Sequence, residues 1–277
     1  MNRVETILDG LSLATSIGVE IGPLDKPLVP KTMGTVFYVD HSDTENLKER
    51  WASDEKVDLD ALHVDAVWGQ DTLQDALEKA AQQQGQEWAG ADYVVASHVI
   101  EHVPDLVSWL REIKETLRPE GVLRLAVPDK RYSFDYLRRL STLAEVADAF
   151  VRKRRVPSGN RILDFTLNVR YIDCAAAWRG EINTNGLESW YTKESSLKLA
   201  RDAEENGTYH DVHCWVFTPR SFAKLMTELA LCGLLEFGCD WLVTTQRDTL
   251  EFFVSMRKTA TYDEAVASWQ RIADSLV

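Results

Sequence analysis

Short apolar runs alternate with helix-length amphipathic stretches along the first half of the chain. Five runs rich in Val and Ile lie at 16–21, 35–40, 62–67, 91–97 and 121–128. None of them alternates cleanly between apolar and polar residues, which is typical of strands buried on both faces. The repeated strand–helix alternation predicts an α/β fold with a doubly wound, mostly parallel sheet and helices on both of its faces.

The stretches between these runs carry signals for helix starts. Asp43, Asp71 and Asp105 stand where N-caps are expected, because such side chains accept hydrogen bonds from the first helical turn. Apolar residues after Asp105 recur at the spacing of one helix face. This stripe consists of Leu106, Leu110, Ile113 and Leu117. We therefore predict that these stretches are the crossover helices of the sheet.

The alternation breaks after Pro128. Residues 129–213 contain helical patches and irregular stretches without a convincing strand, which predicts an inserted helical cap that recognises the substrate. The α/β pattern then returns. We therefore expect an α/β core made of 1–128 and 214–277, with the cap at 129–213.

The last part of the chain predicts one more helix and a closing pair of strands. Thr218 and Pro219 indicate a helix start, and Gly233 indicates its end. The apolar runs at 234–243 and 250–257 are close enough in the sequence to pair antiparallel. The sheet is therefore expected to end in an antiparallel C-terminal hairpin.

Charge and composition narrow the classes of partner. The 277 residues carry a formal net charge of -13, which argues against nucleic acid and anionic membranes as general partners, since these need a cationic face. The basic patch at 151–157 fits a solvated helix end, with an anionic substrate group as the sharper alternative. No apolar run reaches the roughly 18 residues of a transmembrane helix, so no membrane insertion is expected.

The chain start and the cysteines point to a cytoplasmic protein. The first residues, "MNRVETILDG", hold one Arg and two acids but no long apolar stretch, unlike a secretory signal. The cysteines are far apart and never form C-x-x-C, so we expect thiols rather than disulfides. They are Cys174, Cys214, Cys232 and Cys239.

Polar residues gather at the ends of the predicted strands. Glu20 and Gly22 end the first strand, Asp40 ends the second, and Asp65 lies near the end of the third. In open α/β sheets, ligands bind beyond the carboxyl ends of the strands. Asp40 follows Gly22 by 18 residues, and a carboxylate at that distance commonly accepts ribose hydroxyls. The single glycine does not favour a pyrophosphate cradle, which argues for a nucleoside without phosphates and against NAD.

Three segments together resemble a known family. They are "VEIG", "YVDHS" and "DYVVASHVIEHVPDLVSWLREIKETLRPEGVLRLAVPD", which resemble class I S-adenosylmethionine-dependent methyltransferases of the subgroup with "EHV" at the fourth helix. The resemblance covers roughly residues 15–130 and, more loosely, 214–257. It implies a Rossmann-like fold, and the two predicted closing strands match the antiparallel hairpin at the sheet edge of that family. The family's usual G-x-G is reduced here to "GPLD".

The resemblance also implies which residues hold S-adenosyl-L-methionine. Glu20 and Gly22 would face the methionine part, and Asp40 would bind the ribose. Asp65 and Ala66 would contact the adenine, and Ser97 would line the floor of the cofactor site.

A titratable cluster follows the fourth strand. By resemblance, His98 faces the transferred methyl group, and an imidazole accepts a proton near neutral pH, so His98 is the first candidate for the catalytic base. An alternative is a divalent metal such as Mg²⁺. Its ligands would be His98, Glu101, His102 and Asp129, if the helix begins near His98. The structural alternative is that Glu101 and His102 cap the helix.

Further candidates flank the cap. His213, in the cluster "YHDVHCW", is the reserve base if the cap folds over the sheet edge, and Asp129 is a third catalytic candidate. Lys130, Arg131 and Tyr132 begin the cap and would hold a polar acceptor, unless they form a solvated turn. Aromatic residues in or beside the cap, among them Trp215, would stack on sugar rings, with core packing as the alternative.

The resemblance and the strand-end carboxylates favour an S-adenosylmethionine-dependent O-methyltransferase. A hydroxyl of a sugar or glycan is the expected acceptor, because the predicted cap is polar and aromatic and because "VPDKRYSFD" resembles glycan-modifying methyltransferases. The expected partner is a small-molecule or oligosaccharide acceptor, and a homo-oligomer remains open. One alternative is a methyltransferase with an apolar acceptor such as a quinone precursor. Others are a non-catalytic nucleoside-binding module and a nicotinamide-dependent oxidoreductase, which the missing glycines disfavour.

Overall fold

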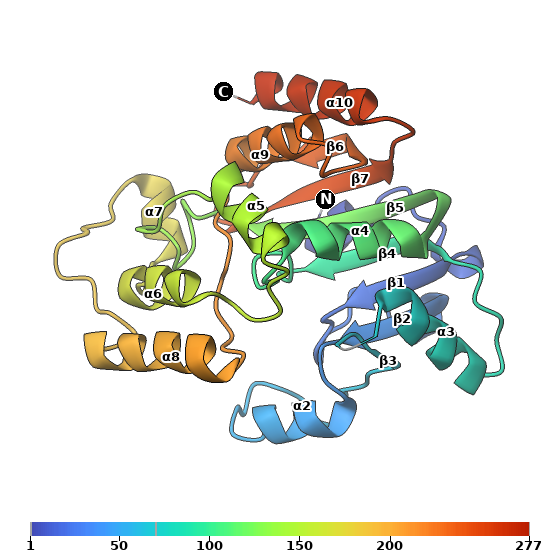
Figure 1. The fold of residues 1–277 in the computed structure, drawn as a ribbon, viewed down its shortest axis with the longest axis horizontal. Coiled ribbons are helices and arrows are strands. Elements are labelled where there is room, and N and C mark those ends of the chain that lie inside the picture. The colour runs from blue at the N-terminus through green and yellow to red at the C-terminus, as the bar shows by residue number, and fades with distance from the viewer. Residues whose placement is uncertain (1, 70, 277) are drawn as a thin grey trace. The chain divides into compact units, whose positions relative to one another are not determined.

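The fold is known from a computed structural model that describes residues 2–69 and 71–276, so the ends of the predicted core, 1 and 277, lie outside the described residues. Within these residues seven strands form one sheet in the order β3-β2-β1-β4-β5-β7-β6 (Figure 1). The strands are β1 (Ile17–Ile21), β2 (Thr35–Asp40), β3 (Ala66–Val67), β4 (Ala91–Ser97), β5 (Leu117–Pro128), β6 (Phe237–Val243) and β7 (Glu251–Lys258). The sheet is mostly parallel and has one antiparallel hairpin, which confirms the predicted Rossmann-like α/β fold.

The strand order reverses at β1. This strand pairs in parallel with β2 on one side and with β4 on the other, and β3 continues in parallel on β2. Gly18 of β1 lies opposite Tyr93 of β4, and a Cβ atom at Gly18 would lie only 2.0 Å from the Cζ atom of Tyr93. The ring of Tyr93 therefore occupies the space that a side chain at position 18 would need.

The helices begin at polar caps. They are α1 (Arg3–Leu8), α2 (Thr44–Trp51), α3 (Leu73–Gln83), α4 (Leu106–Thr116), α5 (Leu143–Val151), α6 (Gly159–Asn168), α7 (Cys174–Arg179), α8 (Lys193–Asn206), α9 (Pro219–Leu231) and α10 (Tyr262–Ser275), with short 3-10 helices at Leu13–Thr15 and Lys31–Met33. The predicted caps Asp43 and Asp105 accept the N–H groups of Asn46 and Ser108. Asp71 was expected to cap α3, but Thr72 does so, and Asp71 pairs with Lys79 instead.

The third strand is shorter than predicted, and the reason lies in Asp65. The run 62–67 was expected to pair throughout, but only Ala66–Val67 does. Asp65 precedes β3 and uses its carboxylate to accept the N–H of Tyr38, while its own N–H donates to the carbonyl of Tyr38. Asp65 thus lies at the amino end of β3, which corrects its predicted place at the carboxyl end.

The chain divides into two compact units. The first comprises Met1–Ser97, Arg111–Leu125 and Ser255–Lys258, and the second comprises His98–Leu110, Ala126–Val254 and Thr259–Val277. In the first unit, α3 lies against β3 (Figure 1). The second unit contains the whole of the predicted cap, 129–213, so the division into core and cap stays a prediction.

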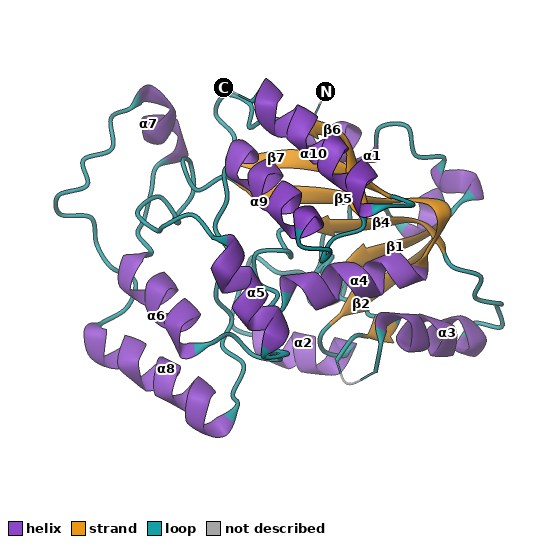
Figure 2. Cartoon of the chain, turned by 45° about the horizontal axis from the view of Figure 1, so that its top comes forward, coloured by secondary structure: helices purple, strands orange, loops and turns teal. Residues whose placement is uncertain are grey.

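In the second unit, helices pack in two pairs. Helix α6 lies along α8, and α9 lies along α10, which also contacts β6 (Figure 1). Residues 129–213 are all described and contain α5, α6, α7 and α8 with loops between them but no named strand, as Figure 2 shows. None of the helices in the described part of the chain combines the length and the apolar character needed to span a bilayer.

A buried ion-pair network joins parts of the second unit. Arg138 is 2% exposed, and its guanidinium donates to Asp135 at 2.7 Å and to Asp164 at 2.8 Å. The same group donates to the carbonyl of His213 at 2.8 Å. Burial disfavours the charged form of Asp135, but the charges of His213 and Arg138 outweigh this and hold the pKa of Asp135 below its usual value.

Replacing Arg138 tests this network. Arg138→Met should lower the free energy of unfolding by roughly 3–5 kcal/mol, because it leaves the Asp135 carboxylate buried without its guanidinium partner. Arg152→Met is the matched control, since Arg152 and Asp148 form an exposed i,i+4 pair. The control should change stability by about 1 kcal/mol or less. Equal losses in the two variants, measured by denaturant unfolding, would contradict the assignment.

Asp65→Asn tests the link between β2 and β3. Burial disfavours the Asp65 carboxylate, but Lys31, the N–H of Tyr38 and His63 outweigh this, so the pKa of Asp65 is lowered from 3.8. A carboxyl whose pKa is lower when folded stabilises the protein above its unfolded pKa and loses this effect as the pH falls through the folded value. The variant should be less stable at neutral pH by roughly 1–3 kcal/mol.

The stability difference should shrink when unfolding is measured between about pH 5 and about pH 3. A difference that stays constant over this range would rule out the ionised Asp65 as its source. Asp71→Asn serves as a control, because Asp71 is exposed and pairs only with an exposed Lys79 among the contacts described.

Candidate active site

The carboxyl ends of β1 and β2 position Gly22 and Asp40 in the first unit. Gly22 has a φ of 65°, a left-handed conformation that favours glycine, and its N–H donates to the carbonyl of Val39 at 2.8 Å. Asp40 ends β2, and its Oδ1 accepts from the backbone N–H of His41 at 2.7 Å and lies 2.6 Å from the His41 ring. The two predicted cofactor residues thus end neighbouring parallel strands.

Glu20 holds the loop that follows β1. Its side chain is buried, and its two oxygens accept the N–H groups of Leu28 at 2.7 Å and Val29 at 2.9 Å. Burial raises the pKa of Glu20, and the two backbone hydrogen bonds oppose this rise. Glu20 therefore fixes the shape of the loop, and its contact with the cofactor stays a prediction.

The remaining predicted cofactor residues are also engaged within the first unit. The Asp65 carboxylate is 2% exposed and accepts from Lys31 at 2.6 Å and from Gln84 at 2.9 Å, so it braces β2 and β3 rather than lining their carboxyl edge. Ala66 begins β3 and is buried. Ser97 ends β4, and its hydroxyl accepts a hydrogen bond from Arg3. The adenine contact expected of Asp65 is not supported by this position.

His98 has an unusual backbone. Its φ is 54°, a left-handed conformation that is uncommon for residues other than glycine. Its N–H donates to the carbonyl of Ala126 at 3.0 Å. The helix does not begin near His98, as the metal alternative assumed, but at Leu106. Residues 98–105 instead form an irregular turn.

Backbone hydrogen bonds bring this turn to the segment before α9. The N–H groups of Cys214 and Trp215 both donate to the carbonyl of Glu101, at 2.6 and 3.1 Å. The indole N–H of Trp215 donates to the carbonyl of Val103 at 2.7 Å. Trp215 is 1% exposed, so its predicted role as a substrate-stacking surface is wrong, and it is a core residue.

Three histidines surround the carboxylate of Glu101. Its Oε1 lies 3.6 Å from Nδ1 of His98, 3.9 Å from Nε2 of His102 and 3.9 Å from Nε2 of His213. Glu101 is fully buried, and neither of its carboxylate oxygens has a hydrogen-bond partner. The predicted candidates His98 and His213 therefore belong to one cluster, with Glu101 at its centre.

Each of these histidines uses its other ring nitrogen to contact a further carboxylate. Nε2 of His98 lies 2.8 Å from Glu251, Nδ1 of His102 lies 2.8 Å from Asp211, and Nδ1 of His213 lies 2.6 Å from Asp135. Because an ionised carboxylate only accepts hydrogen bonds, these nitrogens carry the hydrogen in the neutral form of each histidine, and in that form the nitrogens that face Glu101 carry the lone pair. These three partners could not be predicted from the sequence, because nothing beyond their residue type marks them.

The pKa of His102 reflects this setting. Burial works against the charged imidazolium, but the hydrogen bond to Asp211 and the charges of Glu101, Asp211 and Asp135 outweigh it and raise the pKa of His102. These charges thus favour the protonated form of His102.

Asp129 lies outside this cluster. Its buried carboxylate accepts from the guanidinium of Arg131, with the shortest contact at 2.6 Å, and from the hydroxyl of Thr245 at 2.7 Å. Among the described residues, one group of possible metal ligands has all its ligand atoms within 4.8 Å of one another, and it consists of Glu101, His102 and His213. The predicted metal set is corrected accordingly, since Asp129 is satisfied by Arg131 and Thr245.

The other predicted substrate residues lie at the start of the cap. Nζ of Lys130 donates to the carbonyl of Tyr136 at 2.7 Å, and burial lowers the pKa of Lys130. The rings of Tyr132 and Trp178 are stacked, with centroids 3.9 Å apart and planes 1° apart. Tyr132 therefore stacks within the protein, and Arg131 is engaged with Asp129.

A run of aromatic contacts ends at the histidine cluster. Tyr171 is 69% exposed and lies 5.1 Å from Trp190, which lies 5.0 Å from Phe134, measured between ring centroids. The ring of Phe134 is 4.7 Å from that of His213. We call these three residues, Tyr171, Trp190 and Phe134, the aromatic run. It links an exposed surface of the second unit to a buried histidine.

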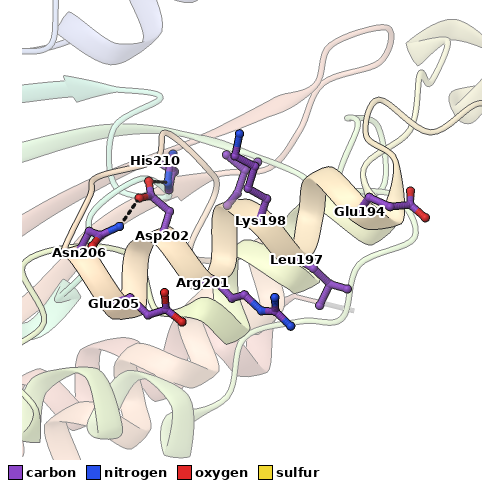
Figure 3. Close-up of a pocket in the computed structure, with 9 residues that line it drawn as sticks. Glu194, Leu197, Lys198, Arg201, Asp202, Glu205, Asn206 and His210 are labelled. Carbon is purple, nitrogen blue, oxygen red and sulfur yellow. Dashed lines mark hydrogen bonds and ion pairs between the residues drawn. The ribbon is translucent and has the colours of Figure 1, made fainter.

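A separate hollow lies along α8 (Figure 3). Charged residues from α8 line it, among them Glu194, Lys198 and Arg201. His210 also lines it and lies 2.8 Å from Asp202, so this histidine of the "YHDVHCW" segment is not part of the cluster around Glu101. The sequence analysis favoured His213 of this segment as the reserve base, and the structure places only His213 beside Glu101 among these two histidines.

Comparisons with known proteins identify the family. A family model described as a methyltransferase domain matches residues 17–231. No curated protein sequence matches the chain significantly. Three solved structures have similar folds. One is a Rhodobacter sphaeroides protein assigned to the Zn-dependent alcohol dehydrogenases, with 12% identity and a TM-score of 0.47 over 93% of this chain and 89% of that chain. Another is the CcbJ methyltransferase of Streptomyces caelestis, with 11% identity and a TM-score of 0.44 over 93% of this chain and 89% of that chain. The third is an S-adenosylmethionine-dependent methyltransferase of Mesorhizobium loti, with 11% identity and a TM-score of 0.42 over 92% of this chain and 95% of that chain.

At these identities and scores, the three structures carry no argument about what the chain binds or does. The family match, in contrast, extends over most of the chain and includes the strands β1 to β5 and the histidine cluster. The chain therefore belongs to the methyltransferase domain family and is an S-adenosylmethionine-dependent methyltransferase.

Proposed function

We propose that the chain transfers the methyl group of S-adenosylmethionine to a hydroxyl group of a sugar or glycan, with His98 as the base. The observation that carries this proposal is the contact between Nε2 of His98 and the Glu251 carboxylate, at 2.8 Å, which orients the imidazole. A hydroxyl needs such a base, because it must lose its proton as it becomes an ether.

The proposed reaction is an in-line displacement at the sulfonium. The acceptor oxygen forms a bond to the methyl carbon while the bond from that carbon to sulfur breaks, which releases S-adenosylhomocysteine. The hydroxyl proton passes to Nδ1 of His98, the nitrogen without the hydrogen-bonded carboxylate. Glu251 then stabilises the resulting imidazolium through Nε2.

The donor side of the proposal uses the ends of β1 and β2. Gly22 lets the chain turn sharply after β1, and Asp40 ends β2 with a carboxylate suited to ribose hydroxyls. Glu20 supports the loop between them through its bonds to Leu28 and Val29. These residues would bind and orient S-adenosylmethionine, and they take no part in proton transfer.

The aromatic run supports a sugar as the acceptor. Exposed aromatic faces such as those of Tyr171 and Trp190 bind the apolar faces of sugar rings, and here they lead to His213. The loops around them carry hydrogen-bonding side chains, including Asn183, Asn185 and Ser189. An apolar acceptor such as a quinone precursor remains the alternative, and these polar loops do not favour it.

The acceptor class can be tested directly. Purified protein is incubated with S-adenosylmethionine labelled at the methyl group and with monosaccharides, oligosaccharides and a hydroxyquinone precursor in parallel. We expect label to enter a carbohydrate as an alkali-stable methyl ether. Label found only in the hydroxyquinone would refute the sugar acceptor while leaving the methyltransferase activity in place.

His98→Gln tests the base. The variant should lower kcat by about 100-fold to 10,000-fold, because it removes the proton acceptor, while calorimetric affinity for S-adenosylhomocysteine stays close to that of the wild type. Asp40→Ala should show the opposite result, a strongly weakened affinity for S-adenosylhomocysteine. His210→Gln is the matched control, since His210 pairs with Asp202 outside the cluster, and it should keep full activity. Lost cofactor binding in His98→Gln would instead make His98 a cofactor residue.

Trp190→Ala tests the aromatic run. We expect it to raise the KM for the carbohydrate roughly 3-fold to 10-fold, as expected for a lost stacking contact, with little change in kcat. Tyr262→Ala is the control, because Tyr262 on α10 is a similarly exposed aromatic residue, 40% against 38% for Trp190. An unchanged KM in Trp190→Ala would remove the aromatic run from the acceptor site.

A further inference from the structure

We propose that Glu101, His102 and His213 bind a divalent transition-metal ion of the Zn²⁺ class. The three residues come from two segments, the turn after β4 and the stretch before α9, and their ligand atoms lie within 4.8 Å of one another. The binding of the ion does not depend on the proposed acceptor. Its role in the reaction does rest on the proposed function.

The buried carboxylate of Glu101 is the strongest reason for a cation. Glu101 is fully buried, and neither of its oxygens has a hydrogen-bond partner. Buried charges in proteins are normally paired, hydrogen-bonded or bound to metal, because an unpaired one loses its hydration without compensation. Its nearest imidazole nitrogens are 3.6 to 3.9 Å away, beyond hydrogen-bond distance. An ion pair with a histidine alone therefore leaves the carboxylate unsatisfied.

The separations of the donors suit one shared ion. Oε1 of Glu101 is 3.9 Å from Nε2 of His102 and 3.9 Å from Nε2 of His213. Two ligands bound tetrahedrally at about 2.1 Å from one zinc ion lie about 3.4 Å apart. All three ligand atoms lie within 4.8 Å of one another, so side-chain rotations that bring each pair closer by about 0.5 to 1.4 Å would close the site.

The histidines are oriented as metal ligands are. The ring nitrogen of His102 that faces away from Glu101 contacts Asp211, and that of His213 contacts Asp135. Metal-binding histidines almost always donate their second N–H to a carboxylate or carbonyl, which fixes the ring and raises its basicity. Asp135 is itself fixed by Arg138. Both imidazoles therefore direct a lone pair toward Glu101.

The ligand set selects the type of ion. Two imidazoles and one carboxylate suit Zn²⁺ and the neighbouring transition metals, whereas Mg²⁺ prefers oxygen ligands and retained water. The sequence suggested Mg²⁺ as a possible ion, but this set of ligands disfavours it. Glu101 and His213 are buried, but the side chain of His102 is 29% exposed, so the site is open on one side.

Three protein ligands leave coordination positions for an outside oxygen. A metal ion in such a site lowers the pKa of a bound hydroxyl group. His98, whose Nδ1 lies 3.6 Å from Glu101, stands at the edge of the site and would be close to that oxygen.

The experiment measures metal binding in the full chain, without donor or acceptor. Protein is freed of metal by a chelator, dialysed and titrated with Zn²⁺, and bound metal is quantified by mass spectrometry. We expect one Zn²⁺ per chain and, with Co²⁺ in its place, visible absorption without thiolate charge-transfer bands. Glu101→Gln and His102→Gln should each weaken Zn²⁺ binding at least about 100-fold.

His210→Gln is the matched control and should bind like the wild type, because His210 lies outside the cluster. Circular dichroism identifies any variant that fails to fold, and His102→Gln, at the partly exposed ligand, then provides the result. Failure of the wild type to bind Zn²⁺ stoichiometrically, unaltered affinity in Glu101→Gln or a thiolate spectrum would overturn the proposal. None of these outcomes would bear on the sugar acceptor, which the labelling assay tests separately.

Discussion

The N–H groups of Cys214 and Trp215 converge on the carbonyl oxygen of Glu101, and the arrangement of the histidine cluster depends on this contact. It holds together two segments that are far apart in the sequence. The indole of Trp215, bonded to the carbonyl of Val103, closes the same junction from the other side. Because the main chain makes the contact, the side chains of Glu101 and His213 remain available for chemistry.

The electrostatics of the second unit follow from this junction. One carboxylate, Glu101, lies inside the ring of histidines, and three others, Asp135, Asp211 and Glu251, lie outside it. Because four carboxylates surround the three imidazoles, the cluster is suited to a cation and poorly suited to an anionic ligand. This agrees with a chain whose net charge is -13.

Six strands of the sheet could be predicted from sequence because each contains a short buried apolar run, although β5 begins at Leu117, before the run 121–128. The third strand could not. The run 62–67 is apolar enough, but the Asp65 side chain takes the N–H of Tyr38 and so limits the strand to Ala66–Val67. A carboxylate that substitutes for a strand neighbour has no signature in the hydrophobic pattern.

The candidate site was predictable only in part. The spacing of His98, Glu101 and His102 drew attention to the right turn, although the helix assumed there begins later. The partners Asp135, Asp211 and Glu251 were missed, since only the tertiary fold decides which carboxylate meets which imidazole. Trp215 was misassigned, because an indole fits a protein core as well as a sugar-binding surface.

The left-handed backbone of His98 has a consequence for the history and engineering of the chain. At such a position a glycine relieves local strain, so selection for thermal robustness alone would tend to replace the imidazole. A bulky β-branched residue would be still worse there than histidine. If His98 is the base as proposed, variants of this protein that gain melting temperature through residue 98 would lose methyl transfer.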